Sequence, residues 1–245
     1  MLKIDELKVS YGGIEAVKGI TFEGPERKIV TLIGANGAGK STTLRTISGL
    51  VKAESGSIQW NGEELLGKPI DKIISAGIAM SPEGRRVFAD LTVLENMRLY
   101  GGIYGLTRMQ ILRRAVEVLD RLDFRSETGT LVGSLPLGWK QKLAFSVSIF
   151  HRPKIVFLDE PTGGVDPATR RQFWELIYQA ADEGITVFVT THFMDEAEYC
   201  DRISIMVDGV IRALDTPGEL KRQFNATTMD DVFQQLARQA VRTAD

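Results

Sequence analysis

The most constraining feature of the sequence is the segment GANGAGKS, residues 34–41, which lies between an apolar run and a helical pattern. It matches in full the strand–GxxxxGK(S/T)–helix pattern of a phosphate-binding loop. Glycines let the backbone N–H groups of such a loop turn inward around phosphates, a lysine supplies positive charge, and a hydroxyl can ligate Mg²⁺. The flanking strand and helix favour this interpretation over a glycine-rich turn without a ligand. The loop residues expected to bind are Gly34, Asn36, Gly37, Ala38, Gly39, Lys40, Ser41 and Thr42.

A second segment, KIVFLDEP, predicts a buried strand over residues 155–158 that ends in two adjacent acids. Two acids at the end of a buried strand are costly unless cations or a reacting water are present. We expect Asp159 to hold Mg²⁺ from the second shell, as in phosphate-binding NTPases. Glu160 is then placed to polarise an attacking water.

Only two histidines occur in the chain. His192 follows the predicted core strand ITVFVTTH, and parallel sheets of this kind bind ligands at the carboxyl ends of their strands. We therefore expect His192 to lie near the terminal phosphate of a bound nucleotide. His151, in FHRPK, is expected to be structural or solvated.

Short β-branched runs alternate with helical patterns along the chain, which predicts one α/β domain over residues 1–245 with a largely parallel, doubly covered sheet. The N-terminal strands and the Asn61-Gly62 turn suggest a small antiparallel layer, and Asp208-Gly209 predicts another hairpin. Residues 92–150 read as a helical insertion. A final helix is expected at about 227–242, starting at a Thr227-x-x-Asp230 capping pattern.

Composition excludes several classes of protein. Thirty Lys and Arg against thirty-two Asp and Glu give a net charge of -2 over 245 residues, so no global field attracts nucleic acid. The doublets Arg85-Arg86, Arg113-Arg114 and Arg170-Arg171 are dispersed and are expected at the solvated surface.

The single cysteine, Cys200, is expected to be a buried, inert thiol. Without an apolar h-region at the start, or an apolar run of membrane-spanning length, the chain is expected to be soluble.

The stretch VGSLPLGWKQK predicts a helix that begins near Gly138, with no hydroxyl or acid at its cap. The free N–H groups and dipole of a helix start favour an anion without any special side chain.

The order of Tyr11, GANGAGKS, SPEGRRVF, LPLGWKQK, KIVFLDEP, GGVDP and TTH resembles the nucleotide-binding subunit of an ATP-binding cassette (ABC) transporter, over essentially the whole chain. The resemblance implies a P-loop NTPase that hydrolyses Mg²⁺-ATP. It implies that Tyr11 stacks on adenine, and that Glu160, His192 and Lys40 are catalytic residues, with Glu160 the base and His192 the switch. Glu83 occupies a position that is usually glutamine, in the loop that contacts the metal or water and the transport subunit.

The resemblance also gives the helix at Gly138 a ligand. Leu135 to Trp139 stands where the family signature reads Leu-Ser-Gly-Gly-Gln, which faces the terminal phosphate of ATP bound to the opposite subunit. Leu135 and Gly138 would then contact nucleotide, and Asp166 would lie in the loop that crosses to that subunit. Pro136 removes the hydroxyl and the N–H of the usual serine, which implies weaker sandwiching of ATP rather than an inert site.

The implied partners are a second ABC ATPase subunit, identical or different, and an integral membrane transport subunit, with the chain on the cytoplasmic face of the membrane and no nucleic acid bound. Residues 1–95 resemble importers of branched-chain amino acids, whereas the chain from about Tyr100 resembles drug and polysaccharide exporters. A hybrid of the two subfamilies is one hypothesis. The alternatives are a catalytically weak or hybrid cassette without a native transport partner, and a non-transport ABC ATPase acting on nucleic acid, which the absence of a coiled-coil insertion and of a basic patch disfavours.

Overall fold

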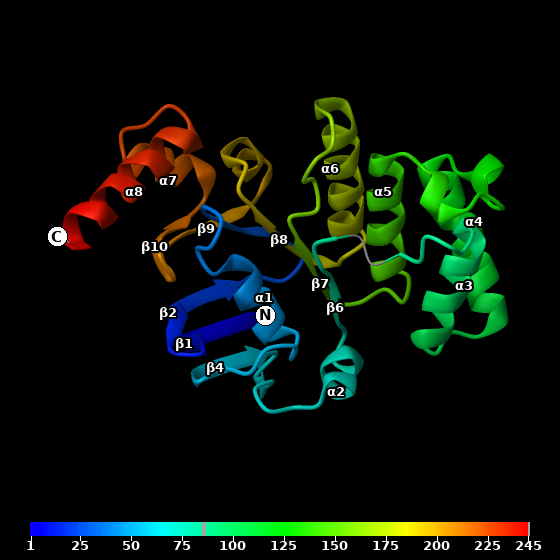
Figure 1. The fold of residues 1–245 in the computed structure, drawn as a ribbon, viewed down its shortest axis with the longest axis horizontal. Coiled ribbons are helices and arrows are strands. Elements are labelled where there is room, and N and C mark those ends of the chain that lie inside the picture. Colours follow the sequence, from blue (N-terminus) through cyan, green and yellow to red (C-terminus); the bar gives the residue numbers. More distant parts are fainter. Residues whose placement is uncertain (85–86, 245) are drawn as a thin grey trace.

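The computed structural model describes residues 1–84 and 87–244, which form two β-sheets flanked by helices (Figure 1). The six-stranded sheet has the order β10-β9-β3-β8-β7-β6, and its neighbouring strands are parallel except for β9 and β10. The four-stranded sheet, of order β2-β1-β4-β5, is antiparallel. The predicted α/β fold, with a mostly parallel core sheet and an antiparallel layer, is confirmed.

The strands and helices have the following residue ranges, given in sequence order. The strands are β1 (Leu2–Tyr11), β2 (Ile14–Gly24), β3 (Ile29–Ile33), β4 (Ser55–Trp60), β5 (Glu63–Glu64), β6 (Ile78–Ser81), β7 (Ile155–Asp159), β8 (Thr186–Thr191), β9 (Arg202–Val207) and β10 (Val210–Asp215). The helices are α1 (Lys40–Ile47), α2 (Ile70–Ser75), α3 (Val93–Ile103), α4 (Arg108–Leu122), η1 (Arg125–Glu127), η2 (Val132–Ser134), α5 (Leu137–Ser148), α6 (Pro167–Asp182), η3 (Met194–Tyr199), α7 (Pro217–Gln223) and α8 (Met229–Ala244).

Both faces of the six-stranded sheet are covered, which explains why β3, β7 and β8 are buried along their whole length. On one face, Leu44 of α1 shares an apolar cluster with Phe157 of β7 and with residues of the antiparallel sheet. On the other face, Phe145 of α5 and Ile177 of α6 pack with Val187 of β8. The sheet is thus held between α1 and the antiparallel layer on one face and α5 and α6 on the other.

Helices α3, α4 and α5 lie together at one end of the molecule, in the stretch that the sequence predicts to be helical (Figure 1). Thr92 and Thr107 begin α3 and α4 with capping boxes completed by Glu95 and Gln110. α5 begins at Leu137, within one residue of the predicted start, and its cap residue Pro136 supplies no side-chain hydrogen bond.

Both predicted tight hairpins are present. Asn61 and Gly62 join β4 to β5 with φ of 52° and 83°, and Asp208 and Gly209 join β9 to β10 with φ of 51° and 81°. Two consecutive positive φ values are those of a type I′ turn, whose twist matches that of the strands.

Three details differ from the predictions. The capping pattern of the last helix is shifted by one residue, because Thr228 Oγ1 accepts from the Asp231 N–H at 3.2 Å while Thr228 N donates to the Asp231 carboxylate. Helix α2 and strand β6 are two further elements that were not predicted. Finally, Arg114 and Arg170 are partly buried rather than solvated, since Arg114 donates to the Phe150 carbonyl and Arg170 packs over a phenyl ring.

Other expectations hold within the described residues. Cys200 is buried, and burial raises the pKa of its thiol. His151 stacks on Tyr104 at 3.9 Å between ring centroids, and burial lowers its pKa to about 4, which makes it a structural residue. The Arg85-Arg86 doublet lies outside the described residues. In the described chain, no helix is both long enough and apolar enough to cross a membrane.

Gly56 of β4 packs closely against β1, so adding a single methyl group at this position is expected to lower the stability of the fold. Gly56 has φ of 104°, and a Cβ there would lie 2.6 Å from the Glu6 carbonyl oxygen and from Leu7 Cα. We expect Gly56→Ala to lower the free energy of unfolding by about 2–4 kcal/mol, because backbone strain adds to overlap with atoms that cannot rotate away. Urea denaturation measures the loss. Gly62→Ala is the matched control: it also has a positive φ, but nothing lies within 4 Å, so we expect only about 1 kcal/mol. Equal losses in the two variants would contradict the steric argument.

Candidate functional site

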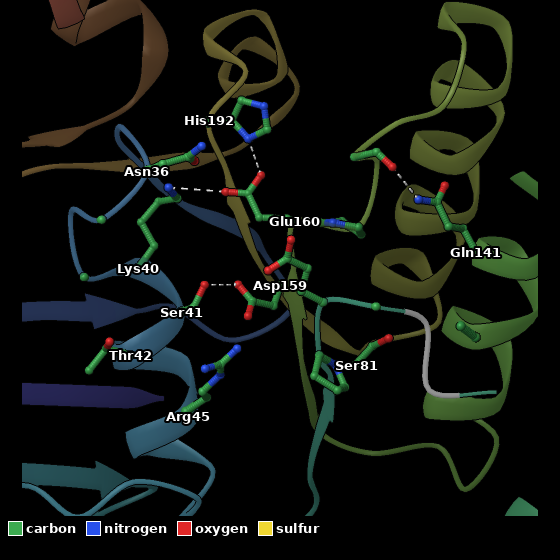
Figure 2. A pocket seen from close by; sticks show the side chains of 18 of the residues that line it. Asn36, Lys40, Ser41, Thr42, Arg45, Ser81, Gln141, Asp159, Glu160 and His192 are labelled. Atoms are coloured by element: carbon green, nitrogen blue, oxygen red, sulfur yellow. Dashed lines mark hydrogen bonds and ion pairs between the residues drawn. The ribbon is translucent and has the colours of Figure 1, made fainter. Parts of the chain in front are cut away.

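The strand order brings the predicted site residues to one edge of the sheet. β3, β8, β7 and β6 are parallel neighbours, so their carboxyl ends lie side by side. These ends carry, in turn, the loop Gly34–Ser41, His192, the pair Asp159 and Glu160, and Ser81 to Glu83. They line a pocket of 710 Å³ (Figure 2). Chain segments that are far apart in the sequence therefore meet at a position where α/β sheets bind ligands.

The loop between β3 and α1 requires glycine at its two ends. A Cβ on Gly34 would lie 2.3 Å from the Met206 carbonyl oxygen, and one on Gly39 would lie 2.5 Å from the Ala16 carbonyl oxygen. Gly39 also has φ of 103° and forms the N-cap of α1 without a side-chain hydrogen bond. The backbone N–H groups at this helix start consequently face the pocket with no side chain in front of them.

Lys40 places a buried positive charge at the centre of the loop. Its side chain is 5% exposed, and Nζ donates to the carbonyl oxygens of Gly34 at 2.9 Å and Ala35 at 3.1 Å. Nζ also lies 3.3 Å from Glu160 Oε1. The ammonium is thus fixed between its own loop and the end of β7.

Asp159 and Ser41 form an oxygen site next to the loop. Asp159 Oδ1 accepts from Ser41 Oγ and from Thr190 Oγ1, each at 2.8 Å. Asp159 Oδ2 is buried and has no hydrogen-bond partner within the described residues. Because Mg²⁺ is bound by carboxylate, hydroxyl and water oxygens, this free carboxylate oxygen beside a hydroxyl fits a magnesium ion.

Glu160 and His192 point toward each other and are in contact at the pocket, as Figure 2 shows. Glu160 Oε2 lies 2.5 Å from His192 Nδ1, and its backbone N–H donates to the Thr190 carbonyl oxygen at 3.1 Å. The Glu160 side chain is 11% exposed and that of His192 is 38% exposed. Glu160 therefore touches both Lys40 and His192, with one carboxylate oxygen for each.

The structure brings together most, but not all, of the residues predicted from the sequence. Those that line the pocket are Asn36, Gly37, Gly39, Lys40, Ser41, Thr42, Glu83, Asp159, Glu160 and His192. Gly34 and Ala38 lie within the loop, where Gly34 supplies a carbonyl to Lys40 and Ala38 is buried.

Besides Gly34 and Ala38, four further predicted residues are not among the described residues that line this pocket. Tyr11 is 46% exposed at the end of β1, and the Leu135 side chain is buried in the apolar cluster of the helical block. Asp166 caps α6, and the Thr169 hydroxyl that it binds lowers its pKa. Gly138 packs against α6, where a Cβ would lie 2.2 Å from Thr169 Cγ2.

The N-terminus of α5 keeps free donors despite Pro136. Among the described residues, no group accepts a hydrogen bond from the backbone N–H of Leu137 or of Gly138. The first backbone N–H groups of this helix that are bonded are those of Trp139 and Lys140, and both donate to the Pro136 carbonyl oxygen. Trp139 stacks on Phe124 at 4.5 Å between ring centroids, which anchors this first turn in the helical block.

Two of the pocket residues that were not predicted, Arg45 and Gln141, have long polar side chains. Arg45 lies one turn after Ser41 on α1, and this spacing could have identified it. Gln141 of α5 is 5% exposed; its Nε2 donates to the Gly163 carbonyl oxygen at 2.9 Å, whereas its Oε1 has no partner in the described chain. Only the packing of α5 on the segment after β7 brings Gln141 to the pocket.

Comparisons with known proteins place this site in a family. The family model for the ABC transporter matches residues 17–163. The chain is 40% identical over 224 residues to the high-affinity branched-chain amino acid transport ATP-binding protein BraG of Pseudomonas aeruginosa, which covers 90% of this chain and 94% of BraG.

Two further matches extend the comparison. The chain is 39% identical over 223 residues to the probable multidrug ABC transporter ATP-binding protein YbhF of Escherichia coli; this match covers 91% of the chain but only 38% of YbhF, so the chain spans about two fifths of that protein. The solved dimeric structure of MJ0796, a bacterial ABC transporter cassette, superposes with a TM-score of 0.79 at 25% identity, covering 88% of this chain and 98% of that one. The chain therefore belongs to the ABC transporter family.

Proposed function

We propose that the chain binds Mg²⁺-ATP in the pocket at the end of the parallel strands and hydrolyses it between two head-to-tail cassettes, which drives transport through a separate membrane subunit. One observation carries this proposal: Lys40, Asp159, Glu160 and His192 come from three separate segments and converge on the phosphate-binding loop. Each has the chemistry that ATP hydrolysis needs.

Ser41 and Asp159 would hold the magnesium ion, since Asp159 has one oxygen on Ser41 and one oxygen free. The ion would neutralise charge on the β- and γ-phosphates. Glu83, an acid in the same pocket, is a further candidate ligand.

Glu160 is suited to be the base. Phosphate oxygens bound in the loop would compete for the Lys40 ammonium, which now lies 3.3 Å from Glu160 Oε1. Oε1 is then free to take the proton of a water whose oxygen attacks the γ-phosphorus, while the bond from that phosphorus to the β–γ bridging oxygen breaks and leaves ADP and phosphate. His192 holds the other carboxylate oxygen at 2.5 Å and keeps the group oriented.

The second cassette would complete the site. The N–H groups of Leu137 and Gly138 lack acceptors in the described part of this chain, which suits a phosphate supplied by a neighbour. Asp166 is exposed at the start of α6, where it can reach that neighbour, and Tyr11 is exposed and available for a base. The dimeric relative supports the same assembly.

The membrane partner and its location are also proposals. The name of YbhF refers to multidrug transport and that of BraG to branched-chain amino acid transport. Both proteins match about nine tenths of this chain. The matches therefore favour neither import nor export, and they do not favour a chain made by joining two subfamilies. We place the chain on the cytoplasmic face of the membrane, with the loop around Glu83 toward the transport subunit. The intact contacts of Lys40, Asp159 and Glu160 favour an active cassette over a weak one.

Replacing the base should separate binding from turnover. In Glu160→Gln, we expect steady ATP hydrolysis to fall by about a hundredfold or more, because the amide cannot take a proton. ATP affinity should be kept or rise, since Lys40 loses a competing carboxylate. Phosphate release and nucleotide titration measure the two. Glu23→Gln, which neutralises an exposed acid paired with Lys3, is the matched control and should behave as wild type. Turnover of Glu160→Gln within tenfold of wild type would remove Glu160 from the role of base.

A site completed by a neighbour should depend on protein concentration. We expect the rate of phosphate release per chain to climb with concentration, and Glu160→Gln to form dimers with ATP, since each cassette supplies the α5 N-terminus of the other. Kinetics and light scattering check this. A flat rate from a chain that remains monomeric with ATP would contradict the two-cassette proposal.

Substitutions at Gly138 test whether glycine is needed at this position for packing against α6 or for close approach to a nucleotide. Gly138→Ala should lower the free energy of unfolding by about 2 kcal/mol, because its Cβ would overlap Thr169 Cγ2. Thr169→Ser should restore stability, since it removes Cγ2 and keeps the hydroxyl that donates to Asp166 at 2.6 Å. If Gly138 approaches the neighbour's ATP, the double variant stays about tenfold or more below wild type in turnover although it is stable. Recovery of turnover together with stability would show that packing on α6 is the only need for this glycine. Thr169→Ser alone is the control.

A further inference from the structure

A buried carboxylate lies beside the site without a role in the steps above. Glu196 belongs to η3, one turn after His192, and its side chain is 0% exposed. A buried carboxylate is costly unless partners compensate its charge. The identity of those partners indicates what Glu196 does.

The first partner belongs to the turn that follows the proposed base. Thr162 Oγ1 donates to Glu196 Oε1 at 2.5 Å, and Thr162 is itself 1% exposed. Only Pro161 separates Thr162 from Glu160, and the Gly163 N–H closes the turn by donating to the Glu160 carbonyl oxygen at 3.2 Å. The position of Thr162 therefore fixes the backbone that carries Glu160.

The second partner links η3 to α6 and to the histidine. Arg170 Nε lies 3.6 Å from the same oxygen, Glu196 Oε1. The Arg170 guanidinium lies 4.0 Å over the centre of the Phe193 ring, which is 4.1 Å from the His192 ring. Arg170 N also donates to the Asp166 carbonyl oxygen at 2.9 Å. One carboxylate oxygen thus joins the segment after Glu160, the first turns of α6 and the residue next to His192.

We propose that Glu196 is a positioning residue for ATP hydrolysis, which through Thr162 and Arg170 holds Glu160 and His192 in their 2.5 Å contact. The inference rests on the proposed function, because the position of Glu160 matters to turnover only if Glu160 is the base. Glu196 itself is not among the described residues that line the pocket.

The partners of Glu196 also keep it charged. Burial raises the pKa of Glu196, while its side-chain hydrogen bonds, that of Thr162 foremost, and the charge of Arg170 lower it, so the partners favour the charged form.

The experiment compares Thr162→Val with Thr162→Ser. Valine keeps the shape of threonine but removes the bond to Glu196, whereas serine keeps the hydroxyl. We expect Thr162→Val to lower kcat by about tenfold or more, because a small displacement of the base is costly, with KM for ATP and Tm close to wild type. Thr162→Ser should restore kcat. Thr46→Val is the matched control, since it also removes a buried hydroxyl, one that donates to the Thr42 carbonyl oxygen at 2.8 Å, and it should leave kcat unchanged.

The outcomes separate the inference from the proposed function. If wild type hydrolyses ATP and Thr162→Val keeps kcat within twofold of it, the positioning role is overturned and the function stands. If serine does not restore kcat, or if kcat falls only in proportion to a lowered Tm, Thr162 serves stability and the inference is again overturned. If wild type shows no turnover, the proposed function itself fails. Should Thr162→Val not fold, Glu196→Gln tests the link from the other side, with the same expected fall in kcat at unchanged KM.

Discussion

The buried charge of Lys40 is the constraint on which the rest of the site depends. An ammonium that is 5% exposed must be surrounded by acceptors, and Lys40 has two carbonyls of its own loop and one carboxylate oxygen of Glu160. The loop can present those carbonyls only because glycine at positions 34 and 39 lets it pass against Met206 and Ala16. Glu160 can reach the lysine only because β8 alone separates β7 from β3. The charge therefore ties loop, sheet order and base into one arrangement.

The same logic explains how α5 keeps its place without the usual polar cap. Pro136 offers no hydroxyl, and no side chain caps the helix. Its position comes instead from packing: Trp139 stacks on Phe124, Gly138 fits against Thr169, and Gln141 binds the Gly163 carbonyl oxygen. A helix start fixed by packing keeps its free N–H groups aimed in one direction, which is what an anion site requires. In the proposed site, proline at position 136 would thus remove a ligand donor without removing the scaffold.

The features that could be predicted from the sequence are those fixed by interactions between residues close together in the chain. The phosphate-binding loop, the acids after β7 and the turns Asn61-Gly62 and Asp208-Gly209 are set by neighbours in the chain, and the structure has them where they were predicted. β6 was missed because it is a four-residue edge strand that pairs only with β7 in the described chain, so its sequence carries little signal. The burial of Arg170 depends on η3 packing against α6, that of Gly138 on α5 packing against α6, and the pocket contact of Gln141 on α5 packing against the segment after β7, so each needs segments that meet only in space. No local pattern encodes that meeting.

The segment from Glu160 to Asp166 connects the chemistry with the surface that a second cassette would touch. At one end the Glu160 N–H is bonded to Thr190, and at the other end Asp166 caps α6. Between them, Thr162 is bound to Glu196 and the Gly163 carbonyl to Gln141 of α5. A segment that is hydrogen-bonded at several points along its length moves as a unit when one end is displaced, because packed interiors resist small deformations. In the proposed dimer, a neighbour that contacts Asp166 or the start of α5 therefore acts on the backbone of Glu160.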